Sequence, residues 1–341
     1  MKAIGYTKSL PITDDNALID IELPQPQASG HDLLVEVKAI AVNPVDYKVR
    51  LWMEPENDEP RVLGWDAVGE VIATGDQVSH FKPGDTVFYA GALTRQGSNA
   101  QYQLVDERIV GHKPKSLSNT EAAALPLTAI TAWELLFDRL GVEKQTPETL
   151  QKTNDVLLIM GAAGGVGSIL IQLAKKLTGA TVIATASRES SKQWVTELGA
   201  DYVIDHSQSI VEQIEQLNIG QVTHVASLTH TDSYLESYVE VLAPMGKLAL
   251  IDDPASFDIS KLKHKSISLH WEFMFTHSMF NTADMISQQE LLNSVSDLID
   301  RGYIKSTLGK NFGTINAKNL KAAHAELESG KSIGKIVLEG F

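Results

Sequence analysis

Cysteine is absent from this chain of 341 residues, so it can form neither a disulfide nor a thiolate metal site. Long apolar runs are missing too, because Gly, Asp or Lys interrupts each one before the roughly 18 residues that a membrane helix needs. The first twenty residues include Lys2, Lys8, Asp14 and Asp15 and do not resemble a signal peptide. We therefore expect a soluble, cytoplasmic protein.

Clusters of Lys and Arg are also lacking, and the formal net charge is -14. Such a surface repels a phosphate backbone unless basic side chains are strongly segregated. We expect no nucleic-acid partner and no membrane partner, so the partner to look for is a small molecule.

The length favours two domains, and the apolar pattern changes along the chain. From Met1 to about Gly111, short runs separated by Pro, Gly and Asp turns indicate an all-β region. Helical spacing follows from Thr120 to Leu140, with Pro126 dividing the segment. Apolar strands and helices then alternate from Asp155 to about Asp252, which predicts an α/β doubly wound parallel sheet of the Rossmann type.

A glycine-rich turn lies between the strand at Asp155–Gly161 and a helix expected over Gly165–Leu177. Gly164 and Gly165 would let the backbone approach a pyrophosphate, and Gly167 would let the helix pack on the strand. Ala162 stands where this fingerprint usually begins with glycine. Because a strand and a helix flank the turn correctly, we interpret it as a dinucleotide site; the alternative is a turn that serves packing alone.

The end of the second strand of this sheet normally distinguishes NAD from NADP. Here the sequence is TASRESSK, in which Ser187, Arg188 and Lys192 provide a hydroxyl and two cations. These groups suit the 2′-phosphate of NADPH. The alternative is that Arg188 and Lys192 only begin a solvated helix and that Glu189 binds the ribose of NAD.

At this point the sequence resembles the medium-chain dehydrogenase/reductase superfamily, in its zinc-free quinone oxidoreductase branch and the related zinc-type alcohol dehydrogenase-like proteins. The resemblance covers nearly the whole chain and rests on these stretches, in order: NPVDYKVR, LGWDAVGEV, PGDTV, SNAQY, LPLTAITAWE, AAGGVG, TASR, LGADYVIDH and GKIVLEG.

The resemblance implies a GroES-like, mostly β catalytic domain over residues 1–124 and 276–341, and a Rossmann domain over residues 125–275, with the active site in the cleft. It further implies a homodimer that pairs around Ile267–Phe275. The cofactor-binding residues that it implies are Asn43 and Thr128 beside the nicotinamide, Ala163, Gly164, Gly165, Val166 and Gly167 at the pyrophosphate, Ser187, Arg188 and Lys192 at the 2′-phosphate, His206 near that phosphate or ribose, and Leu228, Ile251 and Lys335 along the rest of the channel.

A catalytic zinc is not expected, although zinc members of this superfamily carry one. Their metal needs cysteine and a His-Glu pair in a GHE stretch, where this chain has Gly64, Trp65 and Asp66. Trp65 cannot ligate, and no cysteine is present. The histidines show no HExxH or HxxxH spacing, but a site assembled only by folding leaves no such spacing.

Without a metal, positioning and hydrogen-bond donors must carry the reaction. The predicted catalytic residues are Asn43, Tyr47 and Lys48, with Arg50 as a further donor; Asp46 could instead pair with Lys48 or Arg50 structurally. We expect NADPH-dependent reduction of a quinone, enone or aldehyde, since conjugation spreads the developing charge. Zinc-type alcohol dehydrogenase activity and a non-catalytic NADPH sensor are the alternatives.

Overall fold

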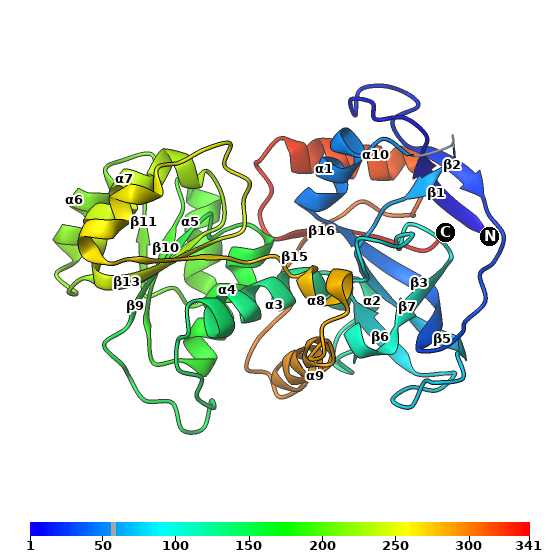
Figure 1. Cartoon of the computed structure of the whole chain (residues 1–341), viewed down its shortest axis with the longest axis horizontal. Helices are drawn as coiled ribbons and strands as arrows, with labels where there is room; N and C mark the ends of the chain where they lie inside the picture. Colours follow the sequence, from blue (N-terminus) through cyan, green and yellow to red (C-terminus); the bar gives the residue numbers. More distant parts are fainter. Residues whose placement is uncertain (56–58) are drawn as a thin grey trace. The chain divides into compact units, whose positions relative to one another are not determined.

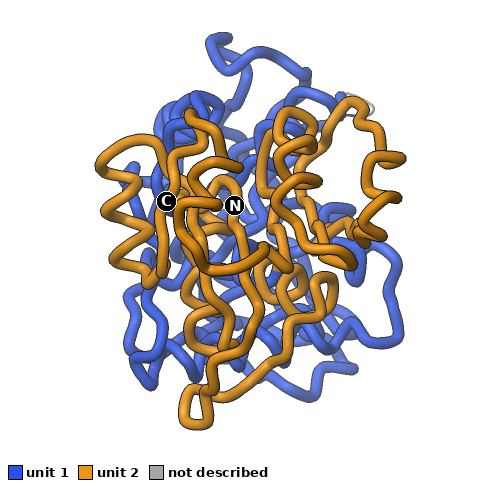
Figure 2. Tube along the Cα trace, turned by 90° about the vertical axis from the view of Figure 1, so that its left-hand side faces the viewer, with its two compact units in different colours: residues 1–130, 275–341 blue, residues 131–274 orange. Residues whose placement is uncertain are grey.

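The structure, a computed structural model, describes residues 1–55 and 59–341 and contains two compact units (Figure 2). Unit 1 comprises Met1–Ile130 and Phe275–Phe341, and unit 2 comprises Thr131–Met274. Helix α3 (Pro126–Trp133) runs across the first boundary, so a change of apolar period alone does not locate that boundary. Among the described residues, no helix is long and apolar enough to span a membrane.

Unit 1 is built on mainly antiparallel β-structure (Figure 1). Its larger sheet has the order β15-β16-β3-β5-β6-β8, with β7 also paired to β3, and a smaller one has the order β2-β1-β4. The strands are β1 (Lys2–Tyr6), β2 (Ile19–Glu22), β3 (Asp32–Val42), β4 (Arg61–Val62), β5 (Asp66–Thr74), β6 (Thr86–Tyr89), β7 (Tyr102–Asp106), β8 (Val110–His112), β15 (Leu308–Asn311) and β16 (Lys335–Glu339).

The end of the chain belongs to unit 1. Strand β16 pairs antiparallel with β3, so that Ile336 lies opposite Val42. The long strand β3 also pairs with β5 and β7, and its apolar side chains are buried among those of its neighbours. The helical elements of unit 1 besides α3 are α1 (Pro44–Trp52), η2 (Glu107–Ile109), α2 (Asn119–Ala123), α8 (Thr276–Phe280), α9 (Ser287–Asp300) and α10 (Ala317–Glu328).

Helix α1 contradicts the expectation that the region up to Gly111 is all β. Its start is encoded locally: Asn43 has an extended backbone at the N-cap, and Pro44 begins the helix with its fixed φ. The Asp46 carboxylate accepts the Asn43 backbone N–H at 2.7 Å, as in a capping box. The Asn-Pro-x-Asp sequence was therefore a helix-start signal that the strand-like runs on either side obscured.

Unit 2 confirms the predicted doubly wound parallel fold. Every pairing in its sheet is parallel, and the order is β11-β10-β9-β12-β13-β14. Counted along the chain, this is the 3-2-1-4-5-6 order of dinucleotide-binding sheets. The elements are η3 (Glu134–Arg139), β9 (Val156–Met160), α4 (Gly165–Leu177), β10 (Thr181–Thr185), α5 (Glu189–Glu197), β11 (Tyr202–Ile204), α6 (Ile210–Leu217), β12 (Val222–Ser227), α7 (Thr231–Val241), β13 (Leu242–Leu250), η4 (Ile259–Lys265) and β14 (Ser268–Trp271).

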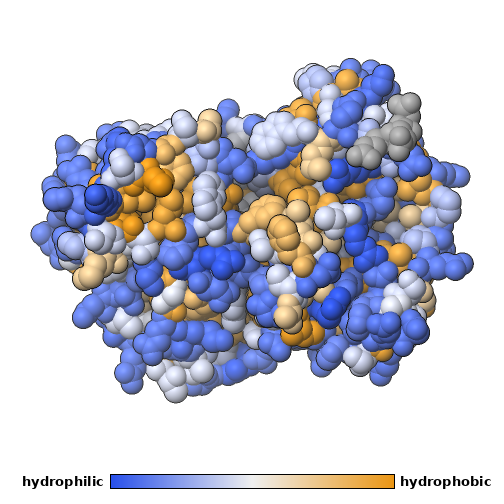
Figure 3. All heavy atoms as spheres, in the orientation of Figure 1, coloured by the Kyte–Doolittle hydropathy of each residue, from blue (hydrophilic) through white to orange (hydrophobic). Residues whose placement is uncertain are grey.

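The central strands β9 and β10 of unit 2 are buried almost along their whole length, as expected where both faces of a sheet are covered. Leu158 of β9, Ile183 of β10 and Val225 of β12 belong to one buried cluster. At the edge of the sheet, Trp271 and Phe273 are about half exposed. Figure 3 shows several hydrophobic patches on one face of the molecule, within a mostly hydrophilic surface.

Candidate functional site

The glycine-rich turn of unit 2 lies between β9 and α4, where the strand order reverses. Gly161 has φ +75°, a left-handed conformation that favours glycine, so the glycine needed here precedes Ala162. A Cβ on Gly167 would lie 2.4 Å from the Ala162 carbonyl oxygen, which explains the requirement for glycine in the helix. A Cβ on Gly164 would meet only the Gly161 oxygen, at 3.4 Å.

Helix α4 begins with backbone donors that its own cap does not use. Its N-cap is Gly164, which has no side chain to accept the first-turn N–H groups of Gly165, Val166 and Gly167. The helix dipole favours an anion at the same place. Ala163 lies in the turn itself. The arrangement suits a pyrophosphate at the switch point of the sheet.

The ends of β10 and β11 lie beside this turn. Thr185 accepts the Gly161 N–H at 3.1 Å, and the Ala186 N–H bonds to the Ile204 carbonyl at 2.9 Å. Ser187 and Arg188 follow β10 directly, and Arg188 is the N-cap of α5. The Arg188 side chain is exposed, and none of the ion pairs found in residues 1–55 and 59–341 involves it.

Lys192 has a partner that sequence reasoning missed. Its ammonium lies 3.3 Å from the carboxylate of Asp205, which follows β11. The hydroxyl and backbone N–H of Ser207 donate to Asp205 and lower its pKa, with a smaller contribution from Lys192. The adjacent His206 is half-buried, and its carbonyl accepts the Tyr234 hydroxyl at 3.4 Å. Lys192 is therefore partly neutralised, whereas Arg188 is not.

Leu228 and Ile251 lie at the same edge of the sheet as the glycine turn. The Leu228 N–H bonds to the Met160 carbonyl, and the Ile251 N–H bonds to the Ser227 carbonyl, both at 3.3 Å. Both side chains are half-buried and follow the ends of β12 and β13. The predicted cofactor residues of unit 2 thus gather along one edge of its sheet, at the carboxyl ends of the strands.

Unit 1 contains a buried polar centre formed by Asn43, Asp66 and Lys335. The Lys335 ammonium lies 2.9 Å from an Asp66 carboxylate oxygen and 2.9 Å from the Val42 carbonyl, and it also donates to the Asn43 side-chain oxygen. The Asn43 amide nitrogen donates to the same Asp66 oxygen at 2.8 Å. All three residues are at most 3% exposed.

Asp66 also fixes the start of α3. Its other carboxylate oxygen accepts the Leu127 backbone N–H at 2.7 Å. The neighbouring Thr128 is buried, and its hydroxyl donates to the Leu125 carbonyl at 3.0 Å. The sequence indicates Asp66 only as part of the stretch where zinc members carry GHE, and no sequence pattern indicates its part in connecting Asn43 with the turn that carries Thr128.

The other predicted catalytic residues lie on α1, outside the polar centre. Tyr47 and Lys48 are half-buried, and the Lys48 ammonium lies 6.0 Å from the centre of the Trp52 ring. Arg50 is fully buried and pairs with Glu328 of α10, which is a structural role. Burial raises the pKa of Asp46 to about 7, even though the hydrogen bond from the Asn43 N–H and the nearby Lys335 ammonium oppose this shift.

The residues at the place of the family's zinc site do not fit a zinc ion. Trp65 is buried, donates its ring N–H to the Ala92 carbonyl at 3.3 Å and packs edge-on against Phe275. The Asp66 carboxylate already forms an ion pair with the Lys335 ammonium. No group of three or more His, Asp or Glu residues with metal-site geometry occurs among the described residues, and the chain has no cysteine.

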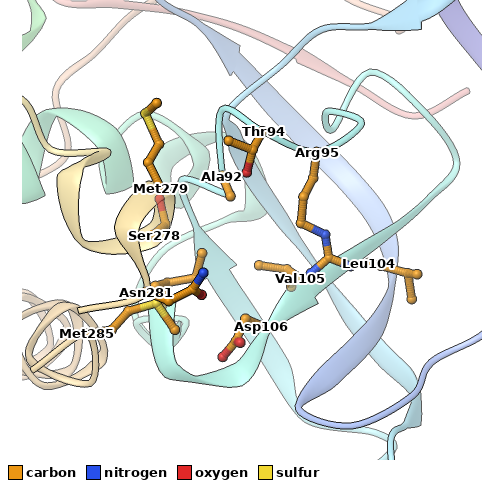
Figure 4. A pocket seen from close by; sticks show the side chains of 11 residues that line it. Ala92, Thr94, Arg95, Leu104, Val105, Asp106, Ser278, Met279, Asn281 and Met285 are labelled. Carbon is orange, nitrogen blue, oxygen red and sulfur yellow. The ribbon is translucent and has the colours of Figure 1, made fainter. Parts of the chain in front are cut away.

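Unit 1 also contains a cavity of about 170 Å³ (Figure 4). None of the predicted site residues lines it. Its charged groups already have partners: Arg95 binds Asp32 at 2.7 and 2.9 Å, and Asp106 binds Arg108. We assign no ligand to this cavity, which is lined by Ala92, Thr94, Arg95, Leu104, Val105, Asp106, Ile109, Ser278, Met279, Asn281 and Met285.

These features define a class of protein: a dinucleotide-type parallel α/β unit in a chain whose other unit is a mostly β domain closed by the C-terminal strand. Two family models match accordingly, "Alcohol dehydrogenase GroES-like domain" over residues 29–115 and "Zinc-binding dehydrogenase" over residues 165–288. The chain belongs to the medium-chain dehydrogenase/reductase superfamily of oxidoreductases, as its sequence indicated.

Similar proteins cover essentially the whole chain. A zinc-type alcohol dehydrogenase-like protein of Staphylococcus epidermidis is 40% identical over 99% of both chains. A Rhizobium etli crystal structure, provisionally named a zinc-dependent alcohol dehydrogenase, is 53% identical with a TM-score of 0.95 and covers 100% of this chain and 98% of that one. Escherichia coli quinone oxidoreductase complexed with NADPH is 25% identical, with a TM-score of 0.82 and 99% and 100% coverage.

Proposed function

We propose that the chain is an NADPH-dependent oxidoreductase that transfers hydride to a quinone, an enone or a related activated carbonyl compound without a catalytic metal. The observation that carries the proposal is the glycine turn at the switch point of unit 2, together with the exposed Arg188 just after the end of β10. The similarity to a quinone oxidoreductase complexed with NADPH supports the same cofactor and substrate class.

The substrate class follows from what the side chains can supply. Bound NADPH supplies the hydride, and the protein must orient the acceptor and stabilise the charge that develops on its oxygen. A quinone or enone spreads that charge by conjugation, whereas oxidation of a simple alcohol needs strong alkoxide stabilisation. Because Trp65 and an Asp66 already paired with Lys335 stand at the family's metal position, we assign the conjugated acceptors. Asn43 and Thr128 would flank the nicotinamide, with Tyr47 and Lys48 as candidate donors.

Two other functions are separable from this one by a single assay. An alcohol dehydrogenase would oxidise alcohols or reduce simple aldehydes, and a sensor would bind NADPH without consuming it. NADPH consumption measured with a panel of quinones, enones, aldehydes and alcohols distinguishes all three. Tight NADPH binding without turnover on any acceptor would favour the sensor.

Arg188→Ala should weaken NADPH binding by about ten- to hundredfold. The substitution removes a charge-assisted contact to the 2′-phosphate worth roughly 1.5 to 3 kcal/mol, and each step of about 1.4 kcal/mol is tenfold in affinity. NADH has no such phosphate, so its affinity should hardly change. Fluorescence titration of both nucleotides into the wild type and the variant measures this.

Lys176→Ala is a matched control, since Lys176 is an exposed cation in the last turn of α4, far along the helix from the glycine turn. It should leave both affinities unchanged. If wild-type affinities for NADPH and NADH are equal, or if Arg188→Ala weakens both equally, NADPH is the wrong cofactor assignment.

Purified protein should contain no stoichiometric zinc, and its activity should survive incubation with a chelator. The reason is the donor set at the family's metal position: Trp65 has no ligating atom, and Asp66 is bound by Lys335. Elemental analysis together with activity measurements before and after chelation tests this. One zinc ion per chain whose removal abolishes activity would contradict the metal-free proposal.

We also propose a homodimer that pairs through the edge strand β14. The partly exposed Trp271 and Phe273 lie at or just after this strand, and uncovered apolar edge strands tend to recruit another strand. Light scattering at working concentration checks the dimer.

We propose that the protein lies in the cytoplasm. A chain without cysteine forms no disulfide, so an oxidising compartment would not stabilise it. Cell fractionation checks this location.

A further inference from the structure

The side chain of Lys335 has its hydrogen-bond donors fully used inside unit 1. An ammonium has three N–H donors and no acceptor. In this structure the three acceptors are the Asp66 carboxylate, the Val42 carbonyl and the Asn43 side-chain oxygen. Lys335 is only 3% exposed. A pyrophosphate or substrate oxygen could bind Lys335 only if one of these buried contacts broke.

The orientation of the Asn43 amide depends on this ammonium. Its oxygen faces Lys335, and its nitrogen faces Asp66 at 2.8 Å. A flipped amide would place N–H groups against an ammonium and an oxygen against a carboxylate, so both contacts would become repulsive. Asp66 and Lys335 together therefore select one orientation of Asn43.

Asp66 and Lys335 also affect the start of α3. Asp66 uses its second oxygen to hold the Leu127 N–H at 2.7 Å, beside Thr128. If the ammonium were removed, Asp66 would remain as a buried carboxylate without a counter-charge, the situation in which breaking a buried ion pair is costly. Relaxation of Asp66 would then release both Asn43 and the first turn of α3.

We propose that Asp66 and Lys335 are a positioning pair, in which the lysine ammonium is a built-in cation that orients Asn43 and Thr128 and does not bind the nucleotide. This inference rests on the proposed function, which places Asn43 and Thr128 beside the nicotinamide. It also revises the role that family resemblance implies for Lys335, from lining the cofactor channel to holding the residues that do.

Lys335→Ala provides the test, because it vacates a buried space bordered by three oxygen atoms that a small alkylammonium ion can enter. In the variant, kcat with a quinone acceptor should fall at least tenfold, while the Kd for NADPH stays within about threefold of wild type. Millimolar ethylammonium should restore kcat and the melting temperature, and equal sodium chloride should not. Lys310→Ala is the control, since Lys310 is an exposed lysine on the adjacent strand β15 that pairs with Glu326.

Two outcomes would overturn the inference. One is a tenfold or larger increase in the Kd for NADPH, which would make Lys335 a nucleotide ligand. The other is a failure of ethylammonium to restore either kcat or melting temperature. If Lys335→Ala does not fold, the wild type decides: the ¹⁵N signal of the Lys335 ammonium should not move when NADPH is added, and a clear shift would contradict the inference.

The proposed function can fail separately. If the wild type binds no NADPH, or reduces no acceptor, that function is wrong, but the Asn43 side-chain amide signals still report on the pair. They should be slow to exchange with solvent in the wild type, exchange quickly in Lys335→Ala and recover with ethylammonium. Unchanged exchange in the variant would show that Lys335 does not hold Asn43.

Discussion

Gly164→Ala should leave the protein folded but weaken NADPH binding by about a hundredfold, or about 2.7 kcal/mol. The backbone at Gly164 has φ -74°, which alanine adopts readily, and the new Cβ would approach only the Gly161 oxygen, at 3.4 Å. In the fingerprint, however, this is the glycine that lets the backbone reach the pyrophosphate. Nucleotide titration by fluorescence and a thermal melt of the free protein measure the two effects separately.

Gly167→Ala is the matched variant, with the opposite pattern. Its Cβ would lie 2.4 Å from the Ala162 carbonyl oxygen and 2.5 Å from the Ala162 Cα, so backbone must shift. Overpacking of this kind costs about 1 to 3 kcal/mol, and unit 2 should unfold at a lower temperature even without nucleotide. If Gly164→Ala binds NADPH as the wild type does, the pyrophosphate is not at this turn.

The nucleotide site was predictable because its determinants are local. The glycine turn, the flanking strand and helix α4 are consecutive, and α4 begins and ends at the predicted residues Gly165 and Leu177. Alternating apolar strands and helices likewise predicted a doubly wound sheet, which the strand order confirms. Both features are determined by residues that are close together in the chain, through backbone conformation and the spacing of apolar residues. A single sequence is therefore enough to recognise them.

The polar centre of unit 1 was not predictable in the same way. Asp66 and Lys335 are 269 positions apart, and no spacing rule connects them. Resemblance to a family suggested that Lys335 lies near the cofactor, but only the pairing of β16 with β3 brings it to Asn43. Lys192 and Asp205 are closer to one another in the sequence, but their contact also depends on a fold-level feature, the parallel pairing of β10 with β11.

The burial of ionisable side chains, and the pKa shifts that result from it, could not be predicted from the sequence. Glu134 and Glu272 of unit 2 are both buried and lie near one another, and the Arg139 side chain lies 2.9 Å from the Glu272 carboxylate. Burial raises the pKa of both carboxyls, as it raises that of Asp46. Each of these groups binds protons more strongly when folded, so each contributes stability at low pH that is lost as the pH rises.

The pKa of His324 is shifted in the opposite direction, so this residue should contribute to the loss of stability in acid. It lies in α10 and is completely buried, and neither ring nitrogen has a hydrogen-bond partner within the described residues. Burial, together with a smaller effect from the charge of the buried Arg50, lowers its pKa to about 3. The unfolded chain binds a proton on this histidine near pH 6.5, but the folded chain does not, so stability falls as the pH drops from about 6.5 towards 3.

His324→Leu should therefore remove a pH-dependent loss of about 3 kcal/mol between pH 7 and pH 4, since each pKa unit corresponds to about 1.4 kcal/mol. Leucine has similar bulk, and the substitution loses no hydrogen bond to any described residue, because the imidazole makes none with them. Urea unfolding of the wild type and the variant at both pH values gives the difference between their free energies of unfolding. The buried carboxyls are present in both proteins, so their effect cancels in this difference. His264→Leu, at an exposed histidine of η4, is the control. A wild-type-minus-variant difference that is the same at pH 7 and pH 4 would mean that His324 is not held neutral by the fold.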